Sequence, residues 1–419
     1  MPENAQTALL VSVSYPSTSR AEALSHMEEL KLLVRTMGIT VLDTVLVNLK
    51  QPRSQFLVGS GKAREIADAA EQYEADCIIF DDELSPSQQR NWEKLTGRCA
   101  IDRHEVILDI FAARAHTKEA ALQVGLARME YSLPRLTRAW THLSRQRGGS
   151  RGTRGEGETQ LEADRRIVLA RIHRIKAELA QVKKQRDTRR KKRTSAHIPV
   201  AAIVGYTNAG KSSLLNALTG AQVLVEDKLF ATLDPTSRKL QIKNGSEIII
   251  TDTVGFIRKL PHDLVDAFKS TLEETVLADL TIHVLDASDP EVLDQYRMTL
   301  TVLDDIGAGG KPSLLVCNKM DLPEAGEAYE ELKAEFPEAL FISTKENRGL
   351  EDVIQALKAM LFDSAPVEKY SIPSHRFDLA ALIHRTGRVI DERYHGNGIV
   401  ITAQVPPKTR GLCAAYVAD

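Results

Sequence analysis

One segment constrains the fold of this 419-residue chain more than any other, the run VAAIVGYTNAGKSSLLNAL at residues 200–218. An apolar stretch leads into Gly205, and Gly210, Lys211, Ser212 and a helix-like stretch follow in the pattern G-x-x-x-x-G-K-S. The glycines let backbone N–H groups curl round a β-phosphate at a helix N-terminus, the lysine neutralises phosphate oxygens, and the serine reaches Mg²⁺. The segment therefore predicts a phosphate-binding loop between a strand and a helix of a mainly parallel sheet.

Two further stretches follow in the order that nucleotide chemistry requires. The loop sequence FATLDPT supplies Thr232 as a candidate γ-phosphate sensor and Mg²⁺ ligand. The run EIIITDTVG is typical of a buried strand that ends at Asp252, a residue placed to hold Mg²⁺ through water. Gly255 follows in the same run, and its N–H can meet the γ-phosphate. We therefore expect Ser212, Thr232 and Asp252 to form the metal site, and Lys211, Thr232 and Gly255 to carry the catalysis.

A third element selects the base. The run PSLLVCNKMDL ends in Asn318-Lys319-x-Asp321, and the carboxylate of Asp321 can accept from both N1–H and the exocyclic amine of guanine, a donor pair that adenine lacks. A backbone N–H in the later stretch LFISTKENRGL can meet guanine O6. We therefore expect GTP and GDP as ligands. The residues expected to contact them are Gly205, Asn208, Ala209, Gly210, Lys211, Ser212, Ser213, Asp252, Gly255, Asn318, Lys319, Asp321, Ser343, Thr344 and Lys345.

Phe256 departs from this pattern. A GTP-hydrolysing switch usually carries, directly after its glycine, a Gln that orients the attacking water. A phenyl ring can neither donate to a water nor accept from one. Either this chain does not hydrolyse nucleotide, or another group aligns the water and intrinsic hydrolysis is slow.

The whole chain is longer than one hydrophobic core usually supports, and its 43% hydrophobic and 27% charged residues are globular values. Short β-branched runs alternate with helical stretches up to about residue 102, which predicts a parallel sheet covered by helices. The fold class is therefore α/β multidomain. We expect a parallel-sheet N-terminal domain at 1–103, an antiparallel helical hairpin at 104–195, a P-loop GTPase domain at 196–365 and a small α+β C-terminal domain at 366–419.

The N-terminal stretch LVGSGKAREI resembles a phosphate loop only superficially. Phe56 stands where the first glycine belongs, and Ala63 replaces the Mg²⁺-binding Ser or Thr. Gly59 and Gly61 are better explained by a strand-to-helix turn, with a nucleotide site as the alternative.

The predicted hairpin rests on seven-residue apolar spacing in two stretches, Leu108, Ala115, Leu122 and Met129, then Leu161, Val168, Ile175 and Val182. Between them lies RQRGGSRGTRGEGETQ, whose glycines deny it a fixed conformation and whose Arg145, Arg147, Arg151 and Arg154 suit phosphates of a folded RNA. Residues 141–195 carry a net charge of +11 on a chain whose remainder carries −13. Such an island predicts a nucleic-acid or acidic partner; a flexible linker and a solvated helix face are the alternatives.

The four cysteines are scattered without a C-x-x-C pair, which argues against a zinc or redox site and fits a reducing, cytoplasmic location. No apolar run approaches the length of a membrane span, so we expect no membrane insertion. We also expect a monomer.

Four stretches together carry a family resemblance: GEGETQLEADRR at 155–166, DIFAARAHTKEAALQVGLARMEY at 109–131, GYTNAGKSSLLNAL at 205–218 and DTVGFIRKLPHDLVDAFKSTLEE at 252–274. They are similar to the HflX family of ribosome-associated GTPases over nearly the whole chain. The resemblance implies an N-terminal HflX domain, a hydrophobic replacement of the catalytic Gln, and binding to the large (50S) ribosomal subunit with dissociation of 70S ribosomes. It also assigns rRNA contact to the glycine-rich loop.

The same resemblance suggests how the water could be aligned. The ribosome is the first candidate, acting with Thr232 and the backbone near Gly255. K⁺ is the second, because Asn208 stands where related GTPases with a hydrophobic substitution bind it; a loop-bracing hydrogen bond is the simpler role of Asn208. The competing functions are a ribosome-assembly or RNA-modification GTPase and a GTP-dependent scaffold with little hydrolysis.

Overall fold

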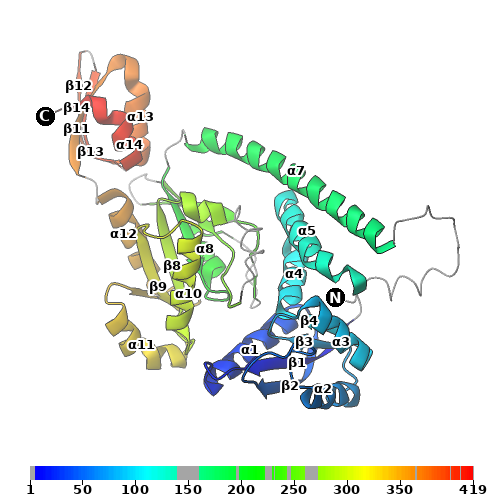
Figure 1. Cartoon of the computed structure of the whole chain (residues 1–419). Coiled ribbons are helices and arrows are strands. Elements are labelled where there is room, and N and C mark those ends of the chain that lie inside the picture. Colours follow the sequence, from blue (N-terminus) through cyan, green and yellow to red (C-terminus); the bar gives the residue numbers. More distant parts are fainter. Residues whose placement is uncertain are drawn as a thin grey trace. The chain divides into compact units, whose positions relative to one another are not determined.

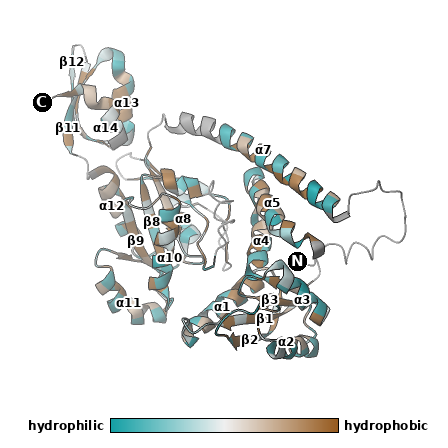
Figure 2. Cartoon of the chain, viewed as in Figure 1, coloured by the Kyte–Doolittle hydropathy of each residue, from teal (hydrophilic) through white to brown (hydrophobic). Residues whose placement is uncertain are grey.

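The computed structural model describes residues 5–138, 160–194, 198–221, 229–230, 232–242, 247–259, 272–363, 366–396, 398–405 and 407–418. These residues form two compact units that meet in sequence at Gln181/Val182. Hydrophobic residues concentrate on the strands, and hydrophilic residues on helices such as α2 (Figure 2). Among the helices of the described ranges, none combines the length and apolarity that a membrane span needs.

The N-terminal part is a parallel four-stranded sheet in the order β2-β1-β3-β4 (Figure 1). Its strands are β1 (Thr7–Ser14), β2 (Thr40–Asn48), β3 (Cys77–Phe80) and β4 (Cys99–Asp102). Its helices are α1 (Arg20–Thr36), α2 (Ser60–Gln72) and α3 (Pro86–Thr96). β3 is buried along its length, as expected for a strand covered on both faces, and Trp92 of α3 packs against Phe80 at its end.

Gly59 and Gly61 lie where the connection from a strand enters a helix, which agrees with their prediction as part of a strand-to-helix turn. Gly59 is the N-cap of α2 with φ −66°, and Gly61 lies in the first helical turn. Strand β2 ends at Asn48, so residues 49–59 form the connection between β2 and α2.

The middle region is helical, but the prediction of one continuous helix through Leu108 and Met129 is wrong. The structure has α4 (Arg103–Arg114), α5 (Lys118–Ser132) and the short 3-10 helix η1 (Leu133–Arg138). Ala115 adopts an extended backbone (ψ 97°), and the Thr117 side chain accepts from the N–H of Ala120 to cap α5. This side-chain cap favours the start of a new helix at Lys118 over the continuation of α4.

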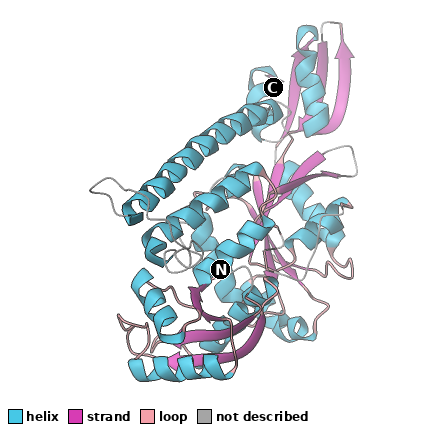
Figure 3. Ribbon diagram, turned by 90° about the vertical axis from the view of Figure 1, so that its right-hand side faces the viewer, coloured by secondary structure: helices cyan, strands magenta, loops and turns pink. Residues whose placement is uncertain are grey.

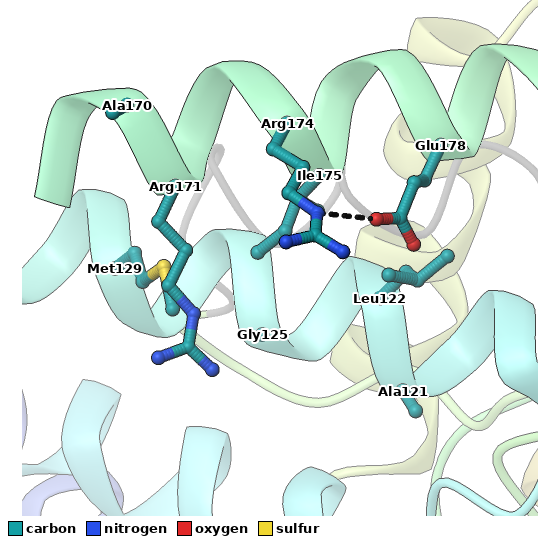
Figure 4. A pocket seen from close by; sticks show the side chains of 9 residues that line it. All are labelled: Ala121, Leu122, Gly125, Met129, Ala170, Arg171, Arg174, Ile175 and Glu178. Carbon is teal, nitrogen blue, oxygen red and sulfur yellow. Dashed lines mark hydrogen bonds and ion pairs between the residues drawn. The ribbon is translucent and has the colours of Figure 1, made fainter. Parts of the chain in front are cut away.

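The second hairpin helix is α7 (Gln160–Thr194), which lies along α5. Ile172 and Ile175 of α7 are buried, Ile175 being a member of the predicted seven-residue series, and Lys176 forms an ion pair with Glu130 of α5 at 2.8 Å. A groove remains between the two helices (Figure 4), lined by Ala121, Leu122, Gly125, Met129, Ala170, Arg171, Arg174, Ile175 and Glu178. The predicted RNA-binding residues Arg145, Arg147, Arg151 and Arg154 lie outside the described residues.

The P-loop part is a six-stranded sheet in the order β10-β9-β8-β5-β7-β6, parallel except for β6. Its strands are β5 (Val200–Gly205), β6 (Thr236–Gln241), β7 (Glu247–Asp252), β8 (Leu280–Asp286), β9 (Ser313–Asn318) and β10 (Leu340–Phe341). Its helices are α8 (Lys211–Thr219), α10 (Val292–Asp305), α11 (Pro323–Glu335), α12 (Leu350–Lys358) and the short η2 (Ala359–Asp363). The parallel strands bring their carboxyl ends to one edge, where ligands of such sheets bind.

The C-terminal part is α+β, as predicted: a strand, a helix and two strands are followed by a further helix and a short strand. Its elements are β11 (Val367–Pro373), η3 (Ser374–Arg376), α13 (Phe377–Thr386), β12 (Arg388–His395), β13 (Gly398–Gln404), α14 (Pro407–Cys413), η4 (Ala414–Tyr416) and β14 (Val417–Ala418). The sheet is antiparallel in the order β12-β13-β11-β14, and helices α13 and α14 cover one face of it (Figure 3).

Candidate nucleotide-binding site

The phosphate-loop sequence lies between β5 and α8, and its glycines are required by its geometry. Gly205 has φ +144°, and a Cβ there would lie 2.2 Å from the Val284 carbonyl oxygen. Gly210 has φ +93°, and a Cβ there would lie 2.2 Å from Asn318 Nδ2. Any side chain at either position would collide with fixed atoms in addition to straining the backbone. The loop thus achieves a tight curl between strand and helix.

Lys211 begins α8 and turns back over the loop. Its Nζ donates to the Tyr206 carbonyl oxygen at 2.6 Å, and its side chain is buried. The pKa of Lys211 is lowered to about 8, mainly by burial and also by the charge of Lys319, against the opposing effect of the Asp252 carboxylate. An anionic phosphate beside this ammonium would favour its charged form.

Three oxygen-bearing side chains from separate elements meet next to this lysine. Ser212 Oγ donates to Asp252 Oδ2 at 2.6 Å and lies 2.8 Å from Thr232 Oγ1. Asp252 is fully buried, its Oδ1 has no hydrogen-bond partner, and burial raises its pKa. A buried carboxylate oxygen without a donor is costly unless a cation binds there. Hydroxyl and carboxylate oxygens are the ligands that Mg²⁺ prefers, so the three residues fit this ion.

Gly255 lies where β7 approaches the phosphate loop. A Cβ on Gly255 would lie 2.7 Å from Lys211 Nζ and 2.9 Å from both Cα and Cγ2 of Thr207. Only glycine therefore allows the chain to approach the loop this closely. The structure brings Gly255, Lys211 and the three oxygen-bearing side chains of Ser212, Thr232 and Asp252 into one cluster.

Phe256 joins the two loops through its backbone. Its N–H donates to the Gly205 carbonyl oxygen at 3.1 Å, and its carbonyl oxygen accepts from the N–H of Thr207 at 2.8 Å. These bonds form a parallel bridge between Tyr206 and Phe256, and the Phe256 ring is only 1% exposed. The side chain at this position is therefore part of the hydrophobic core and offers no polar group to a water.

The base-recognition residues form a second cluster at the ends of β9 and β10. Asn318 Nδ2 donates to the Ala209 carbonyl oxygen at 3.0 Å, and Asn318 Oδ1 accepts from the N–H of Thr344 at 3.1 Å. Ser343 Oγ donates to Asp321 Oδ1 at 2.7 Å, and this bond lowers the pKa of Asp321. Asp321 is thus held as an anionic acceptor, and Asn318 braces the phosphate loop against the Thr344 backbone.

Comparison with known proteins places the chain in a family. Three families match successive segments: "GTP-binding GTPase N-terminal" at residues 24–112, "GTP-binding GTPase Middle Region" at 114–193 and "50S ribosome-binding GTPase" at 200–319. The GTPase HflX of Akkermansia muciniphila is 48% identical over 100% of this chain and 98% of its own length. The chain belongs to the HflX family of GTPases. The GTPase HflX of Escherichia coli K12 is 42% identical over 94% of this chain and 92% of its own length.

A solved structure is also similar, the GTP-binding protein from the archaeon Sulfolobus solfataricus in complex with GDP. It is 26% identical, with 85% of this chain and 98% of that chain covered, at a TM-score of 0.43.

As a member of the HflX family, this chain binds guanine nucleotides and hydrolyses GTP. Of the two explanations of Phe256, the absence of hydrolysis is therefore excluded for this chain.

Two residues of this HflX-family site were not predicted. Asp286, at the end of β8, pairs with Lys319 at 2.6 Å and so fixes the lysine between the two base-recognition residues. Its position at the carboxyl end of a central strand was a usable signal. Thr207 is 6% exposed, and its Oγ1 has no hydrogen-bond partner, which typically costs about 1–3 kcal/mol. It occupies a variable position of the G-x-x-x-x-G-K-S pattern, so spacing alone could not indicate it.

Proposed function

We propose that this HflX-family GTPase binds the large (50S) ribosomal subunit in its GTP state, separates 70S ribosomes into subunits, and is released after hydrolysis that the ribosome stimulates. The observation that carries the proposal is the burial of Phe256. Because the residue after Gly255 gives the attacking water no partner, fast turnover needs a partner that reorders the loops around it. The family description "50S ribosome-binding GTPase" supports the ribosome as that partner.

Each predicted site residue has a role in this proposal. Lys211 neutralises the β- and γ-phosphates, the N–H of Gly255 meets the γ-phosphate, and Asp321 selects guanine. Ser212, Thr232 and Asp252 hold Mg²⁺, which would neutralise charge developing on the phosphates. The remaining nucleotide contacts are those expected of Gly205, Asn208, Ala209, Gly210, Ser213, Asn318, Lys319, Ser343, Thr344 and Lys345.

K⁺ is a second candidate for aligning the water. Asn208 has a left-handed backbone at φ +62°, which turns the loop beside Lys211. A monovalent cation at this residue would lie near the phosphates. Comparing hydrolysis rates in K⁺ and Na⁺ at equal ionic strength tests the idea, and equal rates would exclude a K⁺ requirement.

The mechanical part of the proposal concerns the hairpin. GTP orders the loops at Thr232 and Gly255, and hydrolysis releases that order, so the GTP form binds and the GDP form leaves. The arginines at 145–154 contact rRNA, and they belong to a hairpin domain at 104–195. In the sequence, this domain follows an N-terminal domain at 1–103 and precedes a GTPase domain at 196–365. We place the protein in the cytoplasm as a monomer, with a C-terminal domain at 366–419.

The RNA contact is tested with the triple variant Arg147→Gln, Arg151→Gln, Arg154→Gln. We expect weaker 50S binding and a shallower dependence of log affinity on log salt, because each lost phosphate contact removes roughly 0.7–0.9 from the slope. GTP affinity should not change. A matched control replaces three basic residues of the exposed α7 surface, Arg165, Arg166 and Arg174, and should alter the slope less.

Sedimentation of 70S ribosomes with each variant reads out splitting directly. If the triple arginine variant binds 50S subunits and splits 70S ribosomes normally, the proposed RNA contact is contradicted. Binding only to precursor subunits, with intact 70S ribosomes ignored, would favour the assembly GTPase instead.

A further inference from the structure

Thr207 presents a buried hydroxyl in the phosphate loop that no other group of the described chain binds. The residue is 6% exposed and its Oγ1 has no hydrogen-bond partner. Two neighbouring threonine hydroxyls differ: Thr253 donates to the Ile203 carbonyl oxygen at 2.6 Å, and Thr232 lies 2.8 Å from Ser212 Oγ. The Thr207 hydroxyl is thus free to serve a ligand.

The surroundings of Thr207 indicate which part of a bound nucleotide its hydroxyl would meet. Cα and Cγ2 of Thr207 and Nζ of Lys211 all lie within 3 Å of the position that a Cβ on Gly255 would occupy. The Thr207 N–H is bonded to the Phe256 carbonyl oxygen at 2.8 Å, which fixes the residue against the same segment. Thr207 therefore lies where the phosphate loop meets the segment of Gly255 and Phe256, beside the two groups, Lys211 and Gly255, that are proposed to meet the terminal phosphate.

Its chemistry differs from that of its neighbours. The ammonium of Lys211 and the N–H of Gly255 can only donate, and the ring of Phe256 does neither. A hydroxyl can accept a hydrogen bond from a water and donate one to a phosphate oxygen at the same time. Orienting an attacking water next to a phosphate requires both abilities.

We propose that the Thr207 hydroxyl orients the water that attacks the γ-phosphate in the slow hydrolysis that proceeds without ribosomes, since the Phe256 ring cannot orient it. The water oxygen bonds to the γ-phosphorus as the bond from that phosphorus to the β–γ bridging oxygen breaks. GDP leaves with the electron pair, and the proton of the water passes to a γ-phosphate oxygen. Thr207 holds the water and keeps its own proton overall. This inference rests on the proposed position of the γ-phosphate at Lys211 and Gly255.

The test compares Thr207→Val, which removes the hydroxyl at nearly constant shape, with Thr207→Ser, which keeps it. Single-turnover hydrolysis of GTP by the full chain is measured without ribosomes, together with the affinities for fluorescent GTP and GDP analogues and the melting temperature. We expect Thr207→Val to slow hydrolysis roughly tenfold to a hundredfold with unchanged affinities, because one hydrogen bond to the reacting groups is lost. Thr207→Ser should stay within about threefold of the parent, since the hydroxyl is retained.

A matched control is Thr219→Val. The Thr219 hydroxyl already donates to the Leu215 carbonyl oxygen at 2.6 Å, at the far end of α8, so its loss should leave the hydrolysis rate unchanged. Hydrolysis by Thr207→Val at the parental rate would overturn the proposal. A loss of GTP and GDP affinity that accounts for the whole rate change would also overturn it, because the hydroxyl would then serve binding. Since the assay contains no ribosomes, it is independent of whether 50S subunits bind or stimulate.

Discussion

The chain contains two mainly parallel sheets that carry similar sequences at the start of a helix, one in the N-terminal part and one in the P-loop part. The N-terminal sheet is followed by G-S-G-K at the start of α2, and the P-loop sheet has N-A-G-K at the start of α8. Each sheet also ends a strand in a buried carboxylate, Asp102 on β4 and Asp252 on β7. The two sites differ in how completely the protein satisfies its own polar groups.

Asp102 has protein partners for both oxygens. It accepts from the N–H groups of Leu84 and Glu105 at 3.0 Å and from the Tyr131 hydroxyl at 2.9 Å, and Arg135 lies 3.6 Å away. Asp252 Oδ2 accepts from Ser212, but its Oδ1 has no partner. A satisfied carboxylate stabilises the fold, whereas an unsatisfied one costs stability and is available for a ligand.

The largest expected difference follows from these two carboxylates. Asp102→Ala should reduce the free energy of unfolding by about 3–5 kcal/mol, because Arg135 loses a buried anion and α4 loses its N-cap. Asp252→Ala should change stability by less than about 1 kcal/mol, because Ser212 and Thr232 keep each other as partners, but it should abolish GTP hydrolysis. Urea unfolding followed by far-UV circular dichroism measures both variants.

Equal destabilisation by the two substitutions would break the comparison. It would mean that Asp252 supports the fold as much as Asp102 does. Hydrolysis that survives in Asp252→Ala would contradict its assignment as a metal ligand.

A smaller difference is expected for the glycines that precede the two lysines. Gly210→Ala places a methyl group 2.2 Å from Asn318 Nδ2 at φ +93°, and should lower GTP affinity at least about tenfold, because left-handed backbone alone costs an alanine about 1–2 kcal/mol. Gly61→Ala meets nothing within 4 Å inside α2, and should raise stability by about 0.5–1 kcal/mol. Nucleotide titration and thermal unfolding measure the two effects, and a tolerated Gly210→Ala would refute the tight curl.

These pairs also explain which features the sequence could predict. The phosphate loop was predictable because its glycines are required by the local backbone conformation. The placement of Thr232, Asp252 and Asp321 at one edge of the sheet was predictable because parallel strands bring the segments at their carboxyl ends to that edge. The break at Ala115 was not, because the cap at Thr117 outweighs a seven-residue apolar pattern. The bridge between Tyr206 and Phe256 pairs residues far apart in sequence, and the partnerless state of Thr207 depends on every neighbouring side chain, so neither leaves a local pattern.

The central claim is that the GTP site is chemically incomplete in isolation and that the ribosome completes it. The most direct measurement is the single-turnover rate of GTP hydrolysis by the full chain with and without purified 50S subunits and 70S ribosomes. We predict a slow basal rate and a stimulation of roughly 10³- to 10⁵-fold, equivalent to about 4–7 kcal/mol of transition-state stabilisation. A fast basal rate that added ribosomal particles leave unchanged would contradict the account.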